Sequence, residues 1–247
     1  TLHYVMEACA EANIPVMILD RPNPNGSYID GPTMEEEHTS FLGMHPIPLV
    51  HGMTIAEYAM MINGEKWLKG GLQCDITIIF CENYTHDSEY SLPIRPSPNL
   101  PNDQAIALYP SLGLFEGTNV NAGRGTEYQF QRYGAPFLNP ETMTFTYTPE
   151  ANFGAKYPKH KGELCYGEDL SNENILGEMT LKWIIMAYEN CTDKSLFFLT
   201  DGFTKHAGTE KLQKQIEAGL SESEIKATWQ DDLEKFKETR SKYLIYD

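Results

Sequence analysis

The chain has few basic residues for its length, and this limits the partners that it can bind. Its 247 residues contain 19 Lys and Arg against 35 Asp and Glu, which gives a formal net charge of −16 at pH 7. Nucleic acids are bound through basic patches that contact phosphates, and anionic membrane surfaces attract basic segments. We therefore expect neither a nucleic acid nor an anionic membrane as a partner.

Several motifs of common metal sites and enzymes are also absent. The five cysteines show no CxxC spacing and the seven histidines no HxxxH spacing, so we expect no metal site. There is no GxSxG nucleophile elbow, no GxxxxGK phosphate loop and no GxGxxG fingerprint, so we expect no nucleotide or other cofactor. No run approaches eighteen apolar residues, so we expect no membrane-spanning helix. The oligomeric state is left open.

The composition nevertheless supports a folded protein. Hydrophobic residues make up 41% of the chain and charged residues 22%, which favours a packed core over disorder. Cys9, Cys74 and Cys81 lie in apolar runs and are interpreted as small core residues.

The first hundred residues alternate between helical and extended patterns. We expect helices over 1–13 and from Thr54 onward, and strands over 15–19 and 75–80. Such alternation is typical of a mostly parallel, Rossmann-like sheet. Ligands on such sheets gather beyond the carboxyl ends of the strands, where Asp20 and Arg21 follow the first strand.

The order of the first two elements also predicts something outside the chain. A helix comes before any strand, whereas the helix of an αβ unit normally follows one. We therefore expect a preceding strand, and expect this chain to be the C-terminal part of a longer protein.

A proline-rich segment over 93–103 contains four prolines and predicts a domain boundary. We expect residues 1–102 to be the C-terminal part of a Rossmann-like α/β domain and 103–247 a smaller α+β domain. The expected elements of the second domain are a short helix over 104–108, strands over 112–116 and 142–147, and helices over 181–190, 209–218 and 221–243. The last helix has a predicted buried stripe of Ile225, Trp229, Leu233 and Phe236, and a capping box from Ser221 to Glu224.

The densest candidate site lies between Leu114 and Thr126. It places Glu116 and Asn119 before the glycine-flanked Arg124, and glycine lets a backbone approach a ligand closely. A carboxylate, an amide and a guanidinium can together bind a polyol or an anionic group. The alternative is a glycine-rich turn with a solvated ion pair.

Glycoside hydrolysis generally needs two carboxyl groups, and four acids are candidates: Asp20, Glu57, Glu82 and Glu116. Glu116 ranks first because it would follow an apolar strand and face a cleft. Glu57 is three residues after Thr54, so a helix-capping role is favoured for it. Asp20 could instead form a structural ion pair with Arg21.

The remaining candidates would contact substrate. His51 could hydrogen-bond a sugar or fix a loop through the backbone. Asn23, Asn99 and Asn119 suit hydroxyl or acetamido groups, but each could also close an Asx-turn. Arg124 is the favoured reader of an anionic group, whereas Arg21 and Arg95 could hold their proline-rich loops.

Five segments occur in an order that resembles a known family. They are Leu19–Pro24, His51–Ile55, Arg95–Pro101, Leu114–Thr126 and Tyr133–Pro136. In sequence and spacing they are similar to the bacterial NamZ-type exo-β-N-acetylmuramidases, over essentially the whole chain. The resemblance implies an additional upstream segment that carries a signal sequence and a catalytic Glu-His-Gly motif, neither of which is matched here. It also implies a periplasmic or cell-surface location.

The expected function is therefore release of terminal N-acetylmuramic acid from peptidoglycan fragments by an exo-acting glycoside hydrolase. Glu116 is the predicted catalytic residue, and the predicted substrate-binding residues are Asp20, Arg21, Asn23, His51, Asn99, Asn119 and Arg124. A non-catalytic cell-wall sugar-binding protein is the first alternative. An amidase or esterase is a weaker one, because no nucleophile–histidine pair is visible.

Overall fold

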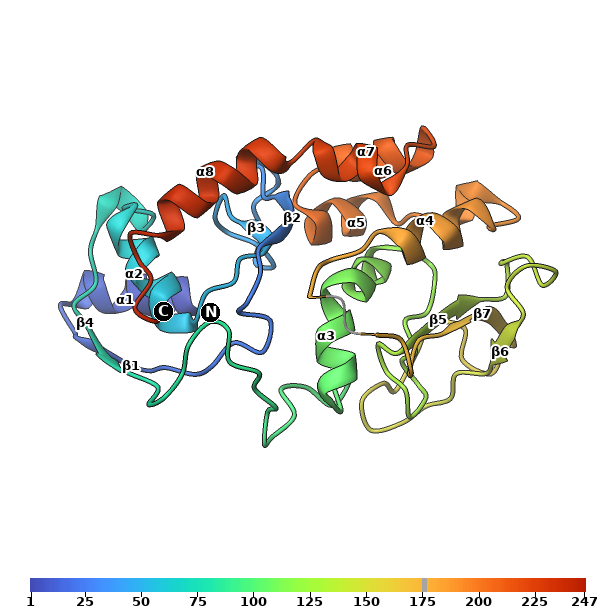
Figure 1. Cartoon of the computed structure of the whole chain (residues 1–247), viewed down its shortest axis with the longest axis horizontal. Helices are drawn as coiled ribbons and strands as arrows, with labels where there is room; N and C mark the ends of the chain where they lie inside the picture. The colour runs from blue at the N-terminus through green and yellow to red at the C-terminus, as the bar shows by residue number, and fades with distance from the viewer. Residues whose placement is uncertain (175–176) are drawn as a thin grey trace.

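A computed structural model describes residues 1–174 and 177–247 of the chain. The molecule is elongated, with α1, α2, β1 and β4 at one end and β5, β6 and β7 at the other (Figure 1). The elements of the first hundred residues are α1 (Leu2–Ala12), β1 (Val16–Leu19), β2 (Asp30–Thr33), η1 (Glu36–His38), β3 (Pro48–Val50), α2 (Ile55–Gly64), η2 (Lys69–Gly71) and β4 (Ile76–Ile79).

The β1 and β4 strands form a parallel pair, which confirms both strands predicted for this region. Val16 lies opposite Ile76 and Leu19 opposite Ile79. Their branched side chains suit a pleated surface. One face packs against the helices in a cluster of buried residues: Met6, Ile18, Ala56, Ala59, Ile62, Leu68 and Cys74.

The predicted capping box at the start of α2 is confirmed. The Glu57 amide donates to the Thr54 hydroxyl at 3.3 Å, and the Glu57 carboxylate accepts from the Thr54 amide at 2.8 Å. Two of the amides that a helix start leaves without partners are thus satisfied.

The second part of the chain is richer in helices. Its elements are α3 (Asp103–Leu112), η3 (Gly113–Gly117), β5 (Arg132–Ala135), β6 (Phe145–Tyr147), β7 (Cys165–Asp169), α4 (Lys182–Glu189), η4 (Lys194–Leu196), α5 (Thr200–Ala207), α6 (Lys211–Glu217), α7 (Glu222–Ala227) and α8 (Gln230–Arg240). The helices predicted over 181–190 and 209–218 are confirmed as α4 and α6. The strand predicted over 142–147 is confirmed in its second half as β6.

The strand predicted over 112–116 is wrong. These residues complete α3 and continue into the 3-10 turn η3. The helix predicted over 104–108 is therefore real but longer, and it passes through Pro110. Glu116 consequently lies on a helical turn and not at the end of a strand.

The single helix predicted over 221–243 is also wrong, because α7 ends before α8 begins. The Thr228 hydroxyl donates to the Ile225 carbonyl at 2.7 Å, which competes with helical hydrogen bonding at this point. The predicted buried stripe and the capping box at Ser221 and Glu224 are both confirmed.

The strands β5 and β7 were not predicted, since each is centred on a glycine. They pair antiparallel with Gly134 opposite Gly167, and β6 pairs with the other edge of β7. A Cβ at Gly167 would collide with the Tyr133 carbonyl, so only glycine allows this approach.

The observed fold is mixed α/β with small sheets. Besides the parallel β1–β4 pair, the described residues form the antiparallel β2–β3 pair and the antiparallel sheet β5–β7–β6. The β2–β3 pair and α5 were also missed. The predicted division at residue 102 stays a prediction.

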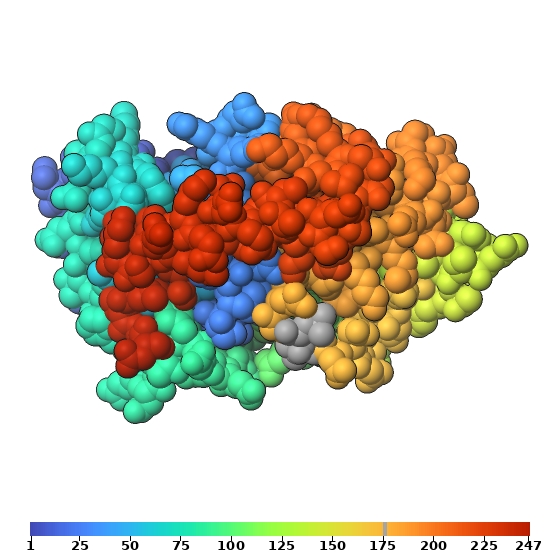
Figure 2. Space-filling model, turned by 45° about the horizontal axis from the view of Figure 1, so that its top comes forward, coloured from blue at the N-terminus to red at the C-terminus, as the bar shows by residue number. Residues whose placement is uncertain are grey.

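The C-terminal helix connects α7 with the N-terminal end of the molecule (Figure 1). α8 runs from α7 back to the N-terminal elements, and the chain ends beside α1 and α2 (Figure 1). The space-filling view shows this C-terminal segment lying across the surface of the N-terminal half (Figure 2). Phe236 of α8 is buried with Met53 and Met61, which gives this crossing an apolar core.

Two further expectations concern the cysteines and the membrane. All five cysteines are free; Cys74 is buried, as expected, and Cys9 and Cys81 are partly buried. None of the helices in the described part of the chain has the length and apolar character needed to cross a bilayer.

Candidate functional site

A cavity lies between the N-terminal elements and α3. It has a volume of about 540 Å³ and includes the predicted residues Asn23 and His51. The opposite wall is formed by Tyr109, Pro110, Gly113 and Leu114. Among the described residues no Asp or Glu lines this cavity, so it does not by itself contain the two carboxyl groups of a glycosidase.

A proline in α3 ties the two walls of the cavity together. Pro110 has no amide hydrogen, so the carbonyl of Ile106, four residues earlier, loses its helical donor. Asn25 replaces that donor, with its Nδ2 at 3.1 Å from the Ile106 oxygen. The carbonyl that Pro110 leaves free in α3 thus accepts a hydrogen bond from the N-terminal part of the chain.

His51 lies on the N-terminal wall in a fixed orientation. Its Nδ1 accepts from the Met53 amide at 3.1 Å, so the proton of the neutral ring is on Nε2. Its ring stacks on Tyr58, with centroids 5.5 Å apart. Burial, helped by the nearby positive charge of Arg240, lowers the pKa of His51 to about 4. At neutral pH His51 is therefore a neutral hydrogen-bond donor.

Asn23 adopts the turn-forming role that the sequence allowed as an alternative. Its Oδ1 accepts from the Asn25 amide at 2.9 Å, and its Nδ2 donates to the Met53 carbonyl at 3.0 Å. These contacts are those of an Asx-turn that fixes the loop. A direct contact with substrate stays a prediction.

Asp20 is buried and anchors two other segments. Its Oδ1 accepts from the Ala56 amide at 3.0 Å, and its Oδ2 accepts from the Tyr246 hydroxyl at 2.8 Å. Arg21, the next residue, is exposed. Asp20 is therefore buried, whereas Arg21 is exposed. The roles in substrate binding that were predicted for both residues stay predictions.

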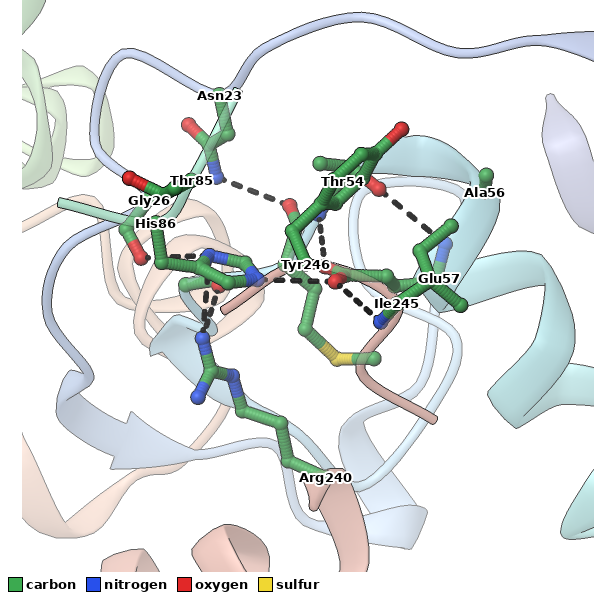
Figure 3. A network of polar contacts seen from close by, with 12 residues as sticks. Asn23, Gly26, Thr54, Ala56, Glu57, Thr85, His86, Arg240, Ile245 and Tyr246 are labelled. Carbon is green, nitrogen blue, oxygen red and sulfur yellow. Dashed lines mark hydrogen bonds and ion pairs between the residues drawn. The ribbon is translucent and has the colours of Figure 1, made fainter. Parts of the chain in front are cut away.

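Glu57 holds the C-terminal tail as well as the start of α2 (Figure 3). Its Oε1 accepts from His86 Nε2 at 2.9 Å and from the Ile245 amide at 3.0 Å. Arg240 lies beside His86 and donates to the carbonyl of Gly52, next to His51. This buried network was not predicted beyond the capping role of Glu57.

Glu116 and Arg124 form the second candidate group. The Arg124 Nη2 lies 3.0 Å from the Glu116 Oε2, and both side chains are partly exposed. The Arg124 guanidinium also lies 5.6 Å from the centre of the Phe130 ring. The two side chains thus form the ion pair that the sequence offered as the alternative, and the binding of a polyol or an anion by them stays a prediction.

The predicted asparagines lie at different places. Asn119 is close to Glu116 along the chain, and its Nδ2 donates to the Leu196 carbonyl at 2.7 Å. Asn99 is buried and donates to the Gly154 carbonyl at 2.9 Å. The Asn99 Oδ1 is buried without a partner in the described part of the protein.

Tyr109 connects the two groups and was not predicted. It lines the cavity, and its ring lies edge-on to Phe130 at 4.9 Å. Burial raises the pKa of Tyr109, and the negative charge of Glu116 adds to this effect. Tyr109 and Arg124 therefore both lie against the Phe130 ring. In the sequence, the only feature that marks Tyr109 as a possible site residue is its position directly before Pro110.

One set of potential metal ligands occurs elsewhere. Ligand atoms of Glu35, Glu37 and His38 lie within 4.8 Å of one another. The Glu35 carboxylate is already bound to Lys211 and accepts from the Thr209 hydroxyl at 2.9 Å. Because its oxygens are engaged, we do not assign a metal to this cluster.

The chain is similar to known proteins in both sequence and fold. The chain is 37% identical, over its whole length, to the peptidoglycan beta-N-acetylmuramidase NamZ of Bacillus subtilis (strain 168), and it spans 63% of that protein, less than two thirds. A crystal structure of a DUF1343 family protein from Bacteroides fragilis NCTC 9343 matches all of the chain with a TM-score of 0.96 and 47% identity, over 70% of its own length. A second DUF1343 protein from the same strain matches with a TM-score of 0.80 at 22% identity, which supports the fold alone.

Two family models also match, one after the other. The model described as "Exo-beta-N-acetylmuramidase NamZ, N-terminal" covers residues 1–104, and the corresponding C-terminal model covers residues 107–246. The chain therefore belongs to the NamZ family.

Proposed function

We propose that the protein acts as an exo-β-N-acetylmuramidase that releases terminal N-acetylmuramic acid from peptidoglycan fragments. The observation that carries the proposal is the similarity of the entire chain to the Bacillus subtilis enzyme of that name. The substrate then places the protein in the periplasm or at the cell surface. We also propose that the β1–β4 pair is part of a Rossmann-like, mostly parallel sheet in the longer family members.

The Glu116–Arg124 pair supports this function through its chemistry. N-acetylmuramic acid differs from N-acetylglucosamine by a lactyl ether with a carboxylate. A guanidinium can bind such a carboxylate through two parallel hydrogen bonds. Arg124 keeps a buried Nε without a partner among the described residues and a side chain that is 37% exposed, so it retains capacity for a further acceptor.

Glu116 would serve as base, nucleophile or electrostatic stabiliser, and its contact with Arg124 at 3.0 Å fixes the position of its carboxyl group. The general acid must then be a different group. Since no carboxyl group of the described residues lines the cavity, we propose that it comes from the additional length of the full family members.

The test uses the protein at its full natural length and a chromogenic β-N-acetylmuramide. We expect hydrolysis by the wild-type protein, and a fall in kcat of about 10²- to 10⁴-fold for Glu116→Gln, the range typical of a general acid or base. Glu127→Gln is the matched control, because Glu127 is an exposed acid in the same loop. Full activity of Glu116→Gln would move the chemistry to other residues.

The absence of a described carboxyl group from the cavity favours a second candidate, a non-catalytic sugar-binding protein. That candidate predicts that the muramide binds without being cleaved. Calorimetric binding together with no product release would establish it and reject the hydrolase.

A further inference from the structure

The segment that carries Glu116 has an unusual set of backbone carbonyls. It begins in the 3-10 turn η3 and continues to Val120. The Phe115 carbonyl accepts from the Thr118 amide at 3.0 Å and from the Thr118 hydroxyl at 2.9 Å, whereas the carbonyls of Glu116, Thr118 and Val120 accept no backbone amide among the described residues. Such a helix end also attracts positive charge. The segment therefore needs a cationic donor from elsewhere in the chain.

Lys159 supplies that cation. Its Nζ lies 2.9 Å from the Phe115 carbonyl oxygen, 3.3 Å from that of Glu116 and 3.4 Å from that of Val120. It also donates to the Thr118 carbonyl. An ammonium group has three hydrogens and can donate three hydrogen bonds. Here four carbonyl oxygens surround it, one more than it has hydrogens.

The neighbouring residue extends the same contact. His160 Nε2 lies 2.6 Å from the Asn119 carbonyl oxygen, and the His160 backbone has a φ of 57° that favours this local geometry. In return, the Asn121 side chain donates to the Lys159 carbonyl at 2.9 Å and to the Arg124 carbonyl at 3.1 Å. Hydrogen bonds thus connect residues 115–121 with residues 159–160. The Asn121 side chain extends this connection to the Arg124 backbone.

The surroundings show that Lys159 does not act through a carboxylate. Fifteen ion pairs are formed by the described residues, and Lys159 takes part in none of them. Burial lowers its pKa, although the charge of Glu116 opposes this effect. A partly buried lysine whose ammonium binds carbonyls and not an acid resembles the way in which carbonyl oxygens replace the hydration shell of a potassium ion.

We propose that Lys159 is a positioning residue for the Glu116 segment, in which its ammonium takes the place of a bound monovalent cation inside a ring of backbone carbonyls. It fixes residues 115–120 so that Glu116 meets Arg124. The significance for catalysis rests on the proposed function, whereas the positioning itself does not.

The experiment compares Lys159→Ala with the matched control Lys161→Ala, an exposed lysine of the same loop, in the full-length protein. Hydrogen–deuterium exchange is measured for peptides that cover residues 113–122. We expect exchange to rise about 10-fold in Lys159→Ala and to stay unchanged in Lys161→Ala, because only the first variant removes the shared donor of the Glu116, Thr118 and Val120 carbonyls. Adding n-propylammonium chloride should restore slow exchange by filling the vacated space, and sodium chloride at equal ionic strength should not.

A parallel measurement of muramide hydrolysis should show a fall in kcat with little change in KM for Lys159→Ala, again rescued by propylammonium. If Lys159→Ala does not fold, Lys159→Met tests the same rise in exchange, since its side chain keeps an aliphatic stem but has neither a donor nor a charge. Unchanged exchange in the Lys159 variants, or equal rescue by both salts, would overturn the proposal. If the wild-type protein cleaves no muramide but the exchange results hold, the proposed function fails and the positioning role stands.

Discussion

At the scale of single residues, His51 shows how the fold fixes a protonation state. Its ring is held between the Met53 amide and Tyr58, and its pKa is lowered from 6.5 to about 4. Between these two values the unfolded chain binds a proton that the folded protein does not bind. The free energy of unfolding should therefore increase as pH rises from 4 to 6.5, and it should gain nothing further from His51 above 6.5.

The measurement is urea denaturation at several pH values for the wild-type protein and for His51→Asn. We expect a shallower pH dependence between pH 4 and 6.5 in the variant. His45, whose pKa is also lowered to about 4 by burial, supplies the dependence that should remain. Identical pH profiles for both proteins would show that His51 is not buried in this way in solution.

At the scale of elements, the two capping boxes give a matched comparison. Both have the same hydrogen bonds at the helix start, but Glu57 is fully buried and Glu224 is exposed. Glu57 also accepts from His86 and from the Ile245 amide. Its removal leaves a buried histidine and a buried amide without their acceptor.

We expect Glu57→Ala to lower the free energy of unfolding by about 3–5 kcal/mol, the usual cost of breaking a buried pair. Glu224→Ala should have a clearly smaller effect, because water can replace its contacts. Urea denaturation of the two variants is the check. Equal losses would mean that the link from Glu57 to the C-terminal tail contributes nothing to stability.

The elements also show what the sequence could predict. The strands β1 and β4 and both capping boxes depend on neighbouring residues, so local patterns were sufficient. The strand predicted over 112–116 was wrong because α3 continues through Pro110, where Asn25 satisfies the freed carbonyl of Ile106. That compensation comes from 81 residues away and cannot be seen in a local pattern.

The candidate site was predictable in part for the same reason. Glu116 and Arg124 are close in the sequence and were correctly associated with each other. Lys159 was missed because its partners are about 40 residues away, although the lysines at 156, 159 and 161 form a basic cluster in an acidic chain. Asp20 was recognised as being at a strand end, but its partner Tyr246 lies at the far end of the sequence.

At the scale of the whole molecule, the C-terminal tail connects the end of the chain with its N-terminal elements. Tyr246 donates to Asp20 and accepts from the Cys81 amide at 2.9 Å, so it contacts the segments after β1 and after β4. Tyr246→Phe should lower the free energy of unfolding by about 1–3 kcal/mol, because it leaves a buried carboxylate oxygen without its donor. Tyr157→Phe, at a residue that is 90% exposed, is the control. A loss no larger than that of the control would show that the tail is not attached through this contact.

The most direct test of the central claim is the ratio of kcat/KM for a chromogenic β-N-acetylmuramide to that for the matching β-N-acetylglucosaminide, measured with full-length wild-type protein and with Arg124→Met. We predict a strong preference for the muramide in the wild-type protein. Loss of a charged hydrogen-bonding group should lower muramide turnover by about 10- to 100-fold and leave the glucosaminide little changed. A wild-type protein that cleaves both sugars equally well, or an Arg124→Met variant that keeps the full preference, would contradict the assignment of Arg124 and its partner Glu116 to the recognition of N-acetylmuramic acid.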